Sequence, residues 1–260
     1  MNRFLKDIKK YKHYTLYAAK SQLKAEVANS YLNWLWWILE PLCFMAMYAF
    51  VFGFLFSKKQ ENFHLYIFIG LAIWDFFNRC IKSSVRMVKR NKAIVAKVYI
   101  PKYLLMISDM RVNAFKMLIC FGIVIIMMVI FRVQISYRII FAVPIVLTAV
   151  VFTFGCCLIL MHLGVFVDDM ANLINIALRF FFYLTGIFYN IETSFPDPYK
   201  TILLKCNPLA CLITALRHCV LYSENIDWVM LIVWFVISVF LVAFGIRIIY
   251  KSENTYVKVI

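Results

Sequence analysis

Residues 79–102 read RCIKSSVRMVKRNKAIVAKVYIPK, with eight Lys and Arg residues between two strongly apolar regions. Membrane proteins keep such segments in the cytoplasm, because basic loops are not readily translocated. If this segment is cytoplasmic, the orientation of every other membrane span follows. Apolar residues interrupt the charges, namely Ile94, Val95, Val98, Tyr99 and Ile100. This mixture predicts a short helix with one face available to a partner.

The composition is that of a membrane protein. The chain has 260 residues, of which 64% are hydrophobic and 16% are charged, whereas a soluble domain is about half apolar and about a quarter charged. One globular core of this size cannot hide so large an excess of apolar side chains. We therefore expect an all-α polytopic membrane protein.

The formal net charge of +15 has two interpretations. Many basic proteins bind nucleic acid, but here the Lys and Arg residues lie at the ends of apolar segments. Orientation in the membrane and contact with anionic lipid explain such charges better. Since no basic domain stands apart from the spans, we expect membrane lipids, and no nucleic acid, among the partners.

The eight Cys residues show no zinc-site spacing with the four His residues. Most lie in apolar runs and are expected to be small buried hydrophobic side chains. Cys206, Cys211 and Cys219 fall in a segment that we place outside, so a disulfide among them is an open alternative. His162 is expected to be a packed or interfacial residue rather than a ligand.

Residues 1–30 are polar and basic, without the short apolar core and cleavage site of a signal peptide. Apolar side chains recur between the Lys residues at roughly helical spacing. This pattern predicts an amphipathic helix along the cytoplasmic interface, with a frayed basic tail as the alternative. In either case the N-terminus is expected in the cytoplasm.

Six apolar stretches are predicted to span the membrane. They cover residues 32–56, 64–80, 102–131, 139–166, 173–189 and 228–250. Residues 190–226 are broken by prolines into apolar pieces, each too short to cross a bilayer core of about 30 Å. We expect short re-entrant helices there, on the outer side. Residues 1–260 then form a single transmembrane domain, with spans 1 to 5 in residues 32–189 and both termini in the cytoplasm.

Ionisable residues inside the spans need partners. Glu40 lies a turn or so inside the first span, and Arg179 lies well inside the fifth. Charges at this depth are costly and must face protein or water rather than lipid. An ion pair between Glu40 and Arg179 is one solution, and a polar pathway beside Arg179 is another. Asp109, Arg111 and Lys116 are expected to pair locally near the interface.

The sequence offers no catalytic motif, since it contains no P-loop, HExxH or GxSxG. Asp168 and Asp169 could act as a paired carboxylate site. A two-residue acidic turn at a membrane edge is more often solvated or docked to a partner. Uphill transport would therefore need a partner protein or an ion gradient. A gradient-driven carrier usually shows internal repeats, and no convincing repeat is visible.

Several short motifs occur along the chain in a characteristic order. They are Leu35-Trp36, Pro41, Gly70, Trp74-Asp75-Phe76-Phe77, Ser83-Ser84, Asn91, Ile94, Lys97, Pro101, Asp169, Thr185-Gly186-Ile187-Phe188-Tyr189, Pro196, Asn207-Pro208-Leu209 and Arg217. In this order and spacing the chain resembles the permease subunits of ABC-2 type transporters. The likeness is to the branch that exports O-antigen, capsular polysaccharide and teichoic acid, and it covers nearly the whole chain.

The resemblance implies a homodimer of six-span permeases with two copies of a separate ABC ATP-binding subunit. It implies no cofactor on this chain, with ATP and Mg on the partner subunit. It also implies two contacts with the ATPase: a coupling helix and the second cytoplasmic turn. The corresponding residues here are Asn91, Ile94, Val95, Lys97, Val98 and Tyr99 for the helix, and Asp168 and Asp169 for the turn.

Two positions depart from the pattern of the family. Many relatives have an Arg where this chain has Asp168, which puts that contact with the ATPase in doubt. Many also have Ser-Pro in place of Thr185-Gly186. The glycine form is more typical of the teichoic acid and capsule exporters.

A channel for a glycan polymer can use aromatic side chains, because sugar rings have apolar faces that stack on them. Core packing or an interfacial belt is the alternative for each aromatic residue. The candidates for the substrate channel are Trp74, Phe77, Phe181, Tyr183, Tyr189, Arg179 and Glu40.

The resemblance favours a permease subunit, not an enzyme, that exports a lipid-linked polysaccharide or teichoic acid precursor across the bacterial cytoplasmic membrane. An ABC-2 exporter of drugs or peptides is one alternative. A membrane enzyme acting on lipid-linked sugars is another, and it would rely on Asp168 and Asp169.

Overall fold

The computed structural model describes residues 2–28, 31–56, 62–97, 100–134 and 136–259. The described chain is helical, with no strand. Its helices are α1 (Asn2–Lys10), α2 (Lys12–Val27), α3 (Trp36–Phe56), α4 (Phe63–Arg90), α5 (Lys92–Lys97), α6 (Tyr103–Ile130), α7 (Ala142–Phe166), α8 (Met170–Leu184), α9 (Ile191–Ser194), α10 (Tyr199–Cys206), α11 (Pro208–Arg217) and α12 (Trp228–Val259). Single turns precede α3 (Asn33–Leu35) and α7 (Tyr137–Phe141), and another follows α11 (His218–Tyr222). The predicted all-α class is confirmed.

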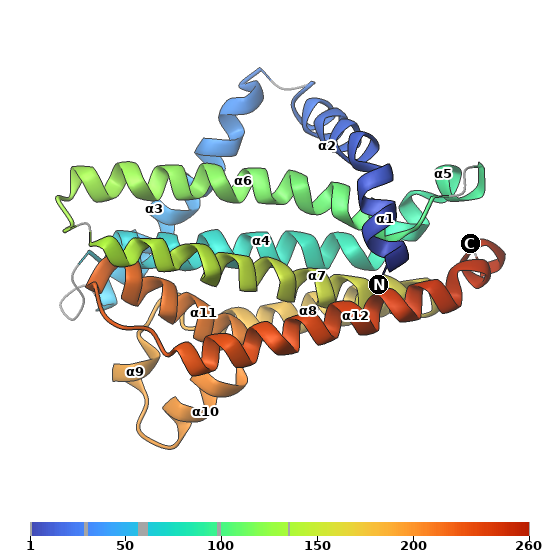
Figure 1. Cartoon of the computed structure of the whole chain (residues 1–260). Helices are drawn as coiled ribbons and strands as arrows, with labels where there is room; N and C mark the ends of the chain where they lie inside the picture. The colour runs from blue at the N-terminus through green and yellow to red at the C-terminus, as the bar shows by residue number, and fades with distance from the viewer. Residues whose placement is uncertain (1, 29–30, 57–61, 98–99, 135, 260) are drawn as a thin grey trace.

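The long helices form a bundle around α4 (Figure 1). Helix α4 packs against α3, α6, α7, α8 and α11, and α7 also packs along α12. Every residue from Leu65 to Trp74 is buried, and all but Gly70 carry an apolar side chain or a large aromatic ring. A helix that is apolar on all sides belongs in an interior.

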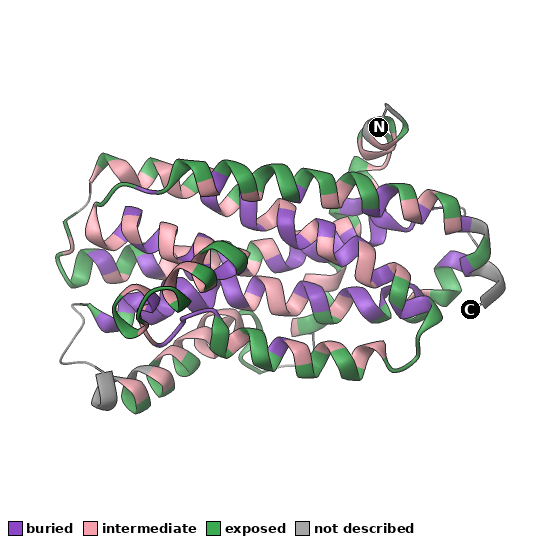
Figure 2. Ribbon diagram, turned by 90° about the horizontal axis from the view of Figure 1, so that it is seen from below, coloured by how far each residue is buried: buried purple, intermediate pink, exposed green. Residues whose placement is uncertain are grey.

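Apolar side chains also cover much of the surface. On α6 they include Leu118, Ile126, Val129 and Ile130, and on α12 they include Val229, Ile232, Val236 and Phe240. Buried residues lie along the middle of the bundle and exposed ones along its outer faces (Figure 2). A water-soluble protein rarely exposes so continuous an apolar surface, so the exposed faces of α6 and α12 fit contact with lipid.

Four segments of the described chain are long and apolar enough to cross a membrane. They are Asn33–Phe52, Tyr103–Ile130, Tyr137–Phe166 and Trp228–Glu253. The pair Tyr199–Cys206 and Pro208–Tyr222, bent by 97°, could count as a fifth. The multi-pass architecture is thereby supported, whereas α4 and the shorter α8, expected as spans two and five, do not meet the same criterion.

The predicted cytoplasmic and external segments separate to opposite ends of the bundle. Helices α1 and α5, the α7–α8 turn and the described C-terminal end lie at one end, toward the right of Figure 1. The α6–α7 connection and α9 lie toward the other end. The expected alternation of sides is therefore compatible with the path of the chain.

Three helices run differently from the predicted segments. Helix α4 continues to Arg90, ten residues past the expected end of the second span at Cys80, because Ile81, Ser84, Val85, Met87 and Val88 remain buried against the bundle. The N-terminal helix is broken at Tyr11 into α1 and α2. The expected tail after Tyr250 is part of α12, where Glu253 and Tyr256 are buried.

Polar contacts hold these terminal segments. Lys102 Nζ lies 3.6 Å from Glu253 Oε1, and His162 Nδ1 lies 2.8 Å from the hydroxyl of Tyr256. His162 is thus a packed residue, as predicted. The hydroxyl of Tyr103 donates a hydrogen bond of 2.6 Å to Asp7 and thereby ties α1 to the start of α6. All eight Cys residues are free thiols, so no disulfide joins Cys206, Cys211 or Cys219.

Helices α4 and α7 approach each other at backbone contact distance. A Cβ atom added to Gly164 would lie 2.0 Å from the carbonyl oxygen of Val85. Small residues at such crossings let helices in a membrane pack closely. Gly164 therefore sets the spacing of α4 and α7 near the end of the bundle that carries α5.

We predict that Gly164→Ala destabilises the protein, because the added methyl group would overlap the backbone of α4. Such overpacking typically costs about 1–3 kcal/mol. Gly122→Ala in α6 is the matched control, because a Cβ there meets nothing within 4 Å. Thermal unfolding in detergent should show a lower midpoint for Gly164→Ala alone. Equal midpoints for the two variants would contradict the close approach.

Candidate functional site

The basic end of the bundle is organised by the junction between α4 and α5. The amide of Asn91 donates a hydrogen bond of 2.8 Å to the carbonyl of Met87, which closes the last turn of α4. The chain then turns into α5 (Lys92–Lys97), so a short helix follows Asn91 as predicted.

The two apolar candidates on α5 have different surroundings. Val95 is 9% exposed and packs inward, whereas Ile94 is 39% exposed. Lys97 ends the helix, and its side chain lies outside the described part of the structure, as do Val98 and Tyr99. The exposed face of α5 thus offers Ile94 to a partner.

The acidic turn between α7 and α8 contacts the same end of α4. Nζ of Lys89 lies 2.5 Å from Oδ1 of Asp168. Lys89 holds the pKa of that carboxyl below its ordinary value, through their hydrogen bond and the opposite charge. Asp169 precedes α8, and its carbonyl accepts the backbone N–H groups of Asn172 and Leu173. The structure therefore brings both predicted partner contacts to one surface.

The ion pair of Asp168 is relevant to the alternative in which Asp168 and Asp169 serve a membrane enzyme. Its carboxylate is engaged by a cation, and it is not part of any group of three or more potential metal ligands among the described residues. The arrangement joins two helices and offers charge at the surface.

A groove of about 400 Å³ lies between α3, α4 and α8, nearer the middle of the bundle. Each helix contributes residues spaced for one face. The lining comprises Glu40, Phe44 and Tyr48 from α3, Leu71, Trp74, Asp75, Asn78, Arg79 and Lys82 from α4, and Asn175, Leu178, Arg179 and Phe182 from α8. Glu40, Trp74 and Arg179, predicted as channel residues, meet here.

The ion pair in the groove differs from the Glu40–Arg179 pair that the sequence suggested. Oε1 of Glu40 lies 2.8 Å from Nη2 of Arg79, so Glu40 pairs with α4 and not with Arg179. Arg179 is exposed, lines the groove and makes no ion pair with any other described residue. Arg79 reaches Glu40 because α3 and α4 pack together, which the sequence does not reveal.

The aromatic candidates divide between two environments. Trp74 is buried in the groove wall, with its ring centroid 5.2 Å from that of Phe182. Phe77 instead stacks on Phe152 of α7 at 6.2 Å and does not line the groove.

The remaining three aromatic candidates lie at or beyond the outer half of α8. Phe181 and Tyr183 are exposed on α8, outside the groove lining. Tyr189 follows α8, where its carbonyl accepts a hydrogen bond of 2.9 Å from the hydroxyl of Tyr66. The groove thus contains one of the five predicted aromatic residues, and Phe44, Tyr48 and Phe182 in addition.

Arg217 anchors the end of the bundle opposite α5. It is 2% exposed, and its guanidinium donates to the carbonyls of Tyr66, Gly186 and Ile187 at 3.1, 2.8 and 3.0 Å. The guanidinium carbon lies 3.4 Å from the centroid of the Tyr66 ring. Gly70 leaves room for it, since a Cβ there would lie 2.6 Å from Nη2. One side chain thereby joins α11, α4 and the turn after α8.

Sequence reasoning assigned no role to Arg217. A cation within the apolar helix Pro208–Arg217 was a usable signal, because such a residue must find partners in the interior. Its partners are backbone carbonyls, however, and these have no signature in the sequence.

The pattern of an ABC-2 type transporter matches residues 16–221, which include α3 to α11 and most of α2. The chain belongs to the ABC-2 type transporter family. It therefore serves as a transport subunit and is not an enzyme.

Three O-antigen export permeases align with most of this chain. It is 22% identical over 239 residues to the O-antigen export system permease protein RfbA of Klebsiella pneumoniae, covering 92% of this chain and 91% of that protein. A second RfbA of that organism is 26% identical over 197 residues, or 75% of each chain. RfbA of Myxococcus xanthus is 21% identical over 215 residues, or 83% of each chain.

We predict that Arg217→Leu lowers the free energy of unfolding by roughly 3 kcal/mol, because buried carbonyls lose their donors. Arg217→Lys should recover only part of this, since one ammonium group cannot reproduce the fork of a guanidinium. Arg179→Leu is the control, because that arginine is exposed and unpaired among the described residues. Denaturation in detergent measures all three variants. A larger effect at Arg179 than at Arg217 would refute the anchoring role.

Proposed function

We propose that this chain is the permease subunit of an ATP-driven exporter that moves a lipid-linked cell-surface polysaccharide across the cytoplasmic membrane. The observation that carries this proposal is the match over 92% of the chain to a permease named for O-antigen export. Two further relatives bear the same name. A teichoic acid or capsule precursor is the closest alternative cargo.

The transport machine in this proposal contains two copies of the permease and two copies of an ABC ATP-binding subunit. ATP and Mg act on that subunit. Each permease crosses the membrane six times, with both termini in the cytoplasm. The separation of α5 and α9 to opposite ends of the bundle supports the alternation of sides. The basic composition of residues 79–102 supports a cytoplasmic location for the end with α5.

The docking surface for the ATPase comprises α5 with the turn at Asp168 and Asp169. Its support is geometric, because the Lys89–Asp168 ion pair places the turn beside the base of α5. A push on α5 would then reach α4 directly and α8 through the turn. Ile94 supplies an exposed apolar side chain, and burying it against a partner is favourable.

The path of the substrate in this proposal includes the groove between α3, α4 and α8. Aromatic rings there can stack on sugar rings, and the charged side chains can exchange hydrogen bonds with hydroxyl groups. Many weak contacts of this kind suit a polymer that must slide. Arg179 lines the groove and forms no ion pair with a described carboxylate, so it is available to the substrate.

We predict that Ile94→Asp reduces recovery of an ABC ATPase with this chain at least tenfold in native affinity purification from mild detergent. A carboxylate at the centre of an apolar contact would be desolvated without a partner. Ile202→Asp is the control, because Ile202 is exposed on α10 at the other end of the bundle. Recovery of the wild-type chain alone, still turning over a lipid-linked sugar, would instead favour the membrane enzyme.

We also predict that Arg179→Ala lowers export of the polymer severalfold while the amount of bound ATPase stays constant. The control Arg247→Ala removes an exposed cation of α12 that does not line the groove. Polymer retained in the cytoplasm of cells that express each variant provides the measurement. If a toxin accumulates instead of a glycan, the cargo is a drug or peptide.

A further inference from the structure

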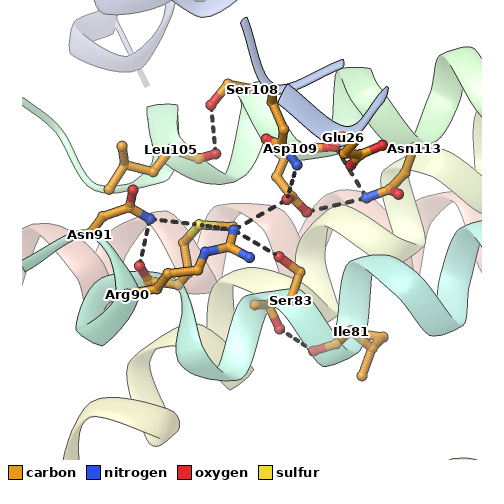
Figure 3. Close-up of polar contacts among 12 residues, drawn as sticks. Glu26, Ile81, Ser83, Arg90, Asn91, Leu105, Ser108, Asp109 and Asn113 are labelled. Carbon is orange, nitrogen blue, oxygen red and sulfur yellow. Dashed lines mark hydrogen bonds and ion pairs between the residues drawn. The ribbon is translucent and has the colours of Figure 1, made fainter. Parts of the chain in front are cut away.

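Asp109 is a buried carboxylate contacted from three helices. It lies in the second turn of α6 and is 3% exposed. Its Oδ1 accepts from Arg90 of α4 and from Gln22 of α2, each at 3.4 Å, and its Oδ2 accepts from Asn113 at 3.2 Å. Figure 3 shows Arg90 and Asn113 converging on this carboxylate. Loss of Arg90 would leave this buried carboxylate without a counterion, which is strongly destabilising.

Arg90, the cation of this pair, lies at the junction between α4 and α5. Arg90 is the last residue of α4, and Asn91 closes that helix before α5 begins. Displacement of α5 must therefore change the position of Arg90 relative to α6. The Arg90–Asp109 ion pair is the described ionic contact between this junction and α6.

Asp109 also connects the junction to α2. Three polar contacts join α2 to α6: Thr15 with Arg111 at 2.5 Å, Gln22 with Asp109 at 3.4 Å, and Glu26 with Lys116 at 2.6 Å. These replace the local pairing that the sequence suggested for α6. Among the three contacts of α2, that with Asp109 includes a carboxylate that also binds α4.

The far end of α2 leads toward the groove. The chain passes from α2 to α3, which carries Glu40 and its ion pair with Arg79. The polar contacts themselves run from α5 through Arg90, Asp109 and Gln22 to α2.

The side chains around Asp109 have space to move. A cavity of about 360 Å³ lies between α2, the α4–α5 junction and α6, and its lining includes Tyr17, Gln22, Arg90, Ile94 and Asp109. Close-packed interiors resist displacement. Here the side chains of Arg90 and Ile94 can change position without opening the core.

We propose that Asp109 is a positioning residue that couples the docking helix α5 to the interface helix α2 through Arg90 and Gln22. Movement of the ATPase then shifts α2 together with the α4–α5 junction. This inference rests on the proposed function, since it assigns a route for energy within an ATP-driven exporter.

The test uses the permease with its ATPase partner in vesicles, and measures ATP hydrolysis and polymer export in the same sample. Asp109→Asn keeps the shape of the side chain but removes its charge. Export per ATP should fall at least fivefold while hydrolysis stays within twofold of wild type. Lys116→Gln, which breaks a contact of α2 with α6 but none with α4, should leave export per ATP within twofold.

A second variant distinguishes loss of coupling from a simple folding defect. Arg90→Gln changes a side chain that is half exposed, and it should reduce export per ATP as Asp109→Asn does. The double variant should be no worse than the more affected single variant, because both remove one link. Loss of export and hydrolysis in parallel, an unchanged ratio, or independent effects in the double variant would overturn the coupling role. A wild-type complex that hydrolyses ATP without export would overturn the proposed function itself.

Discussion

Close packing of α4 is the constraint on which the rest of the structure depends. In lipid, apolar side chains gain little by leaving one apolar surface for another, so helices associate through van der Waals contact and hydrogen bonds. Helix α4 provides both. Its backbone touches α7 at Gly164 near one end, and Gly70 admits the Arg217 guanidinium near the other. The neighbouring helices take their positions from a central helix that is buried along its N-terminal half.

The end of the bundle that carries α5 is held by ion pairs between helix ends. Lys89 joins α4 to the turn before α8, Arg90 joins α4 to α6, and Lys102 joins the start of α6 to Glu253 in α12. In these pairs Lys89, Arg90 and Asp168 are exposed, whereas Asp109, Lys102 and Glu253 are buried. The pairs give the short helix α5 a firm base, since the residues just before it are fixed to two other parts of the bundle.

The groove shows how a polar path can exist in an apolar bundle. Glu40, Arg79 and Arg179 come from three helices, and each is costly in lipid when alone. Gathered around one hollow, they face each other and the groove. Trp74 and Phe182 line the same groove, with their ring centroids 5.2 Å apart. The same groove therefore solves a folding problem and is the surface that the proposed function assigns to the substrate.

The sequence by itself determined the helical class, the approximate positions of the helices and a short helix after Asn91. Those features depend on hydropathy, charge and prolines, which act within a few residues. Only the tertiary structure decided that α4 continues to Arg90, that Glu40 pairs with Arg79, and that α12 incorporates the tail with Glu253. It alone assigned backbone partners to Arg217. The reason is physical, since each of these outcomes depends on which residues meet across helices that are distant in the chain.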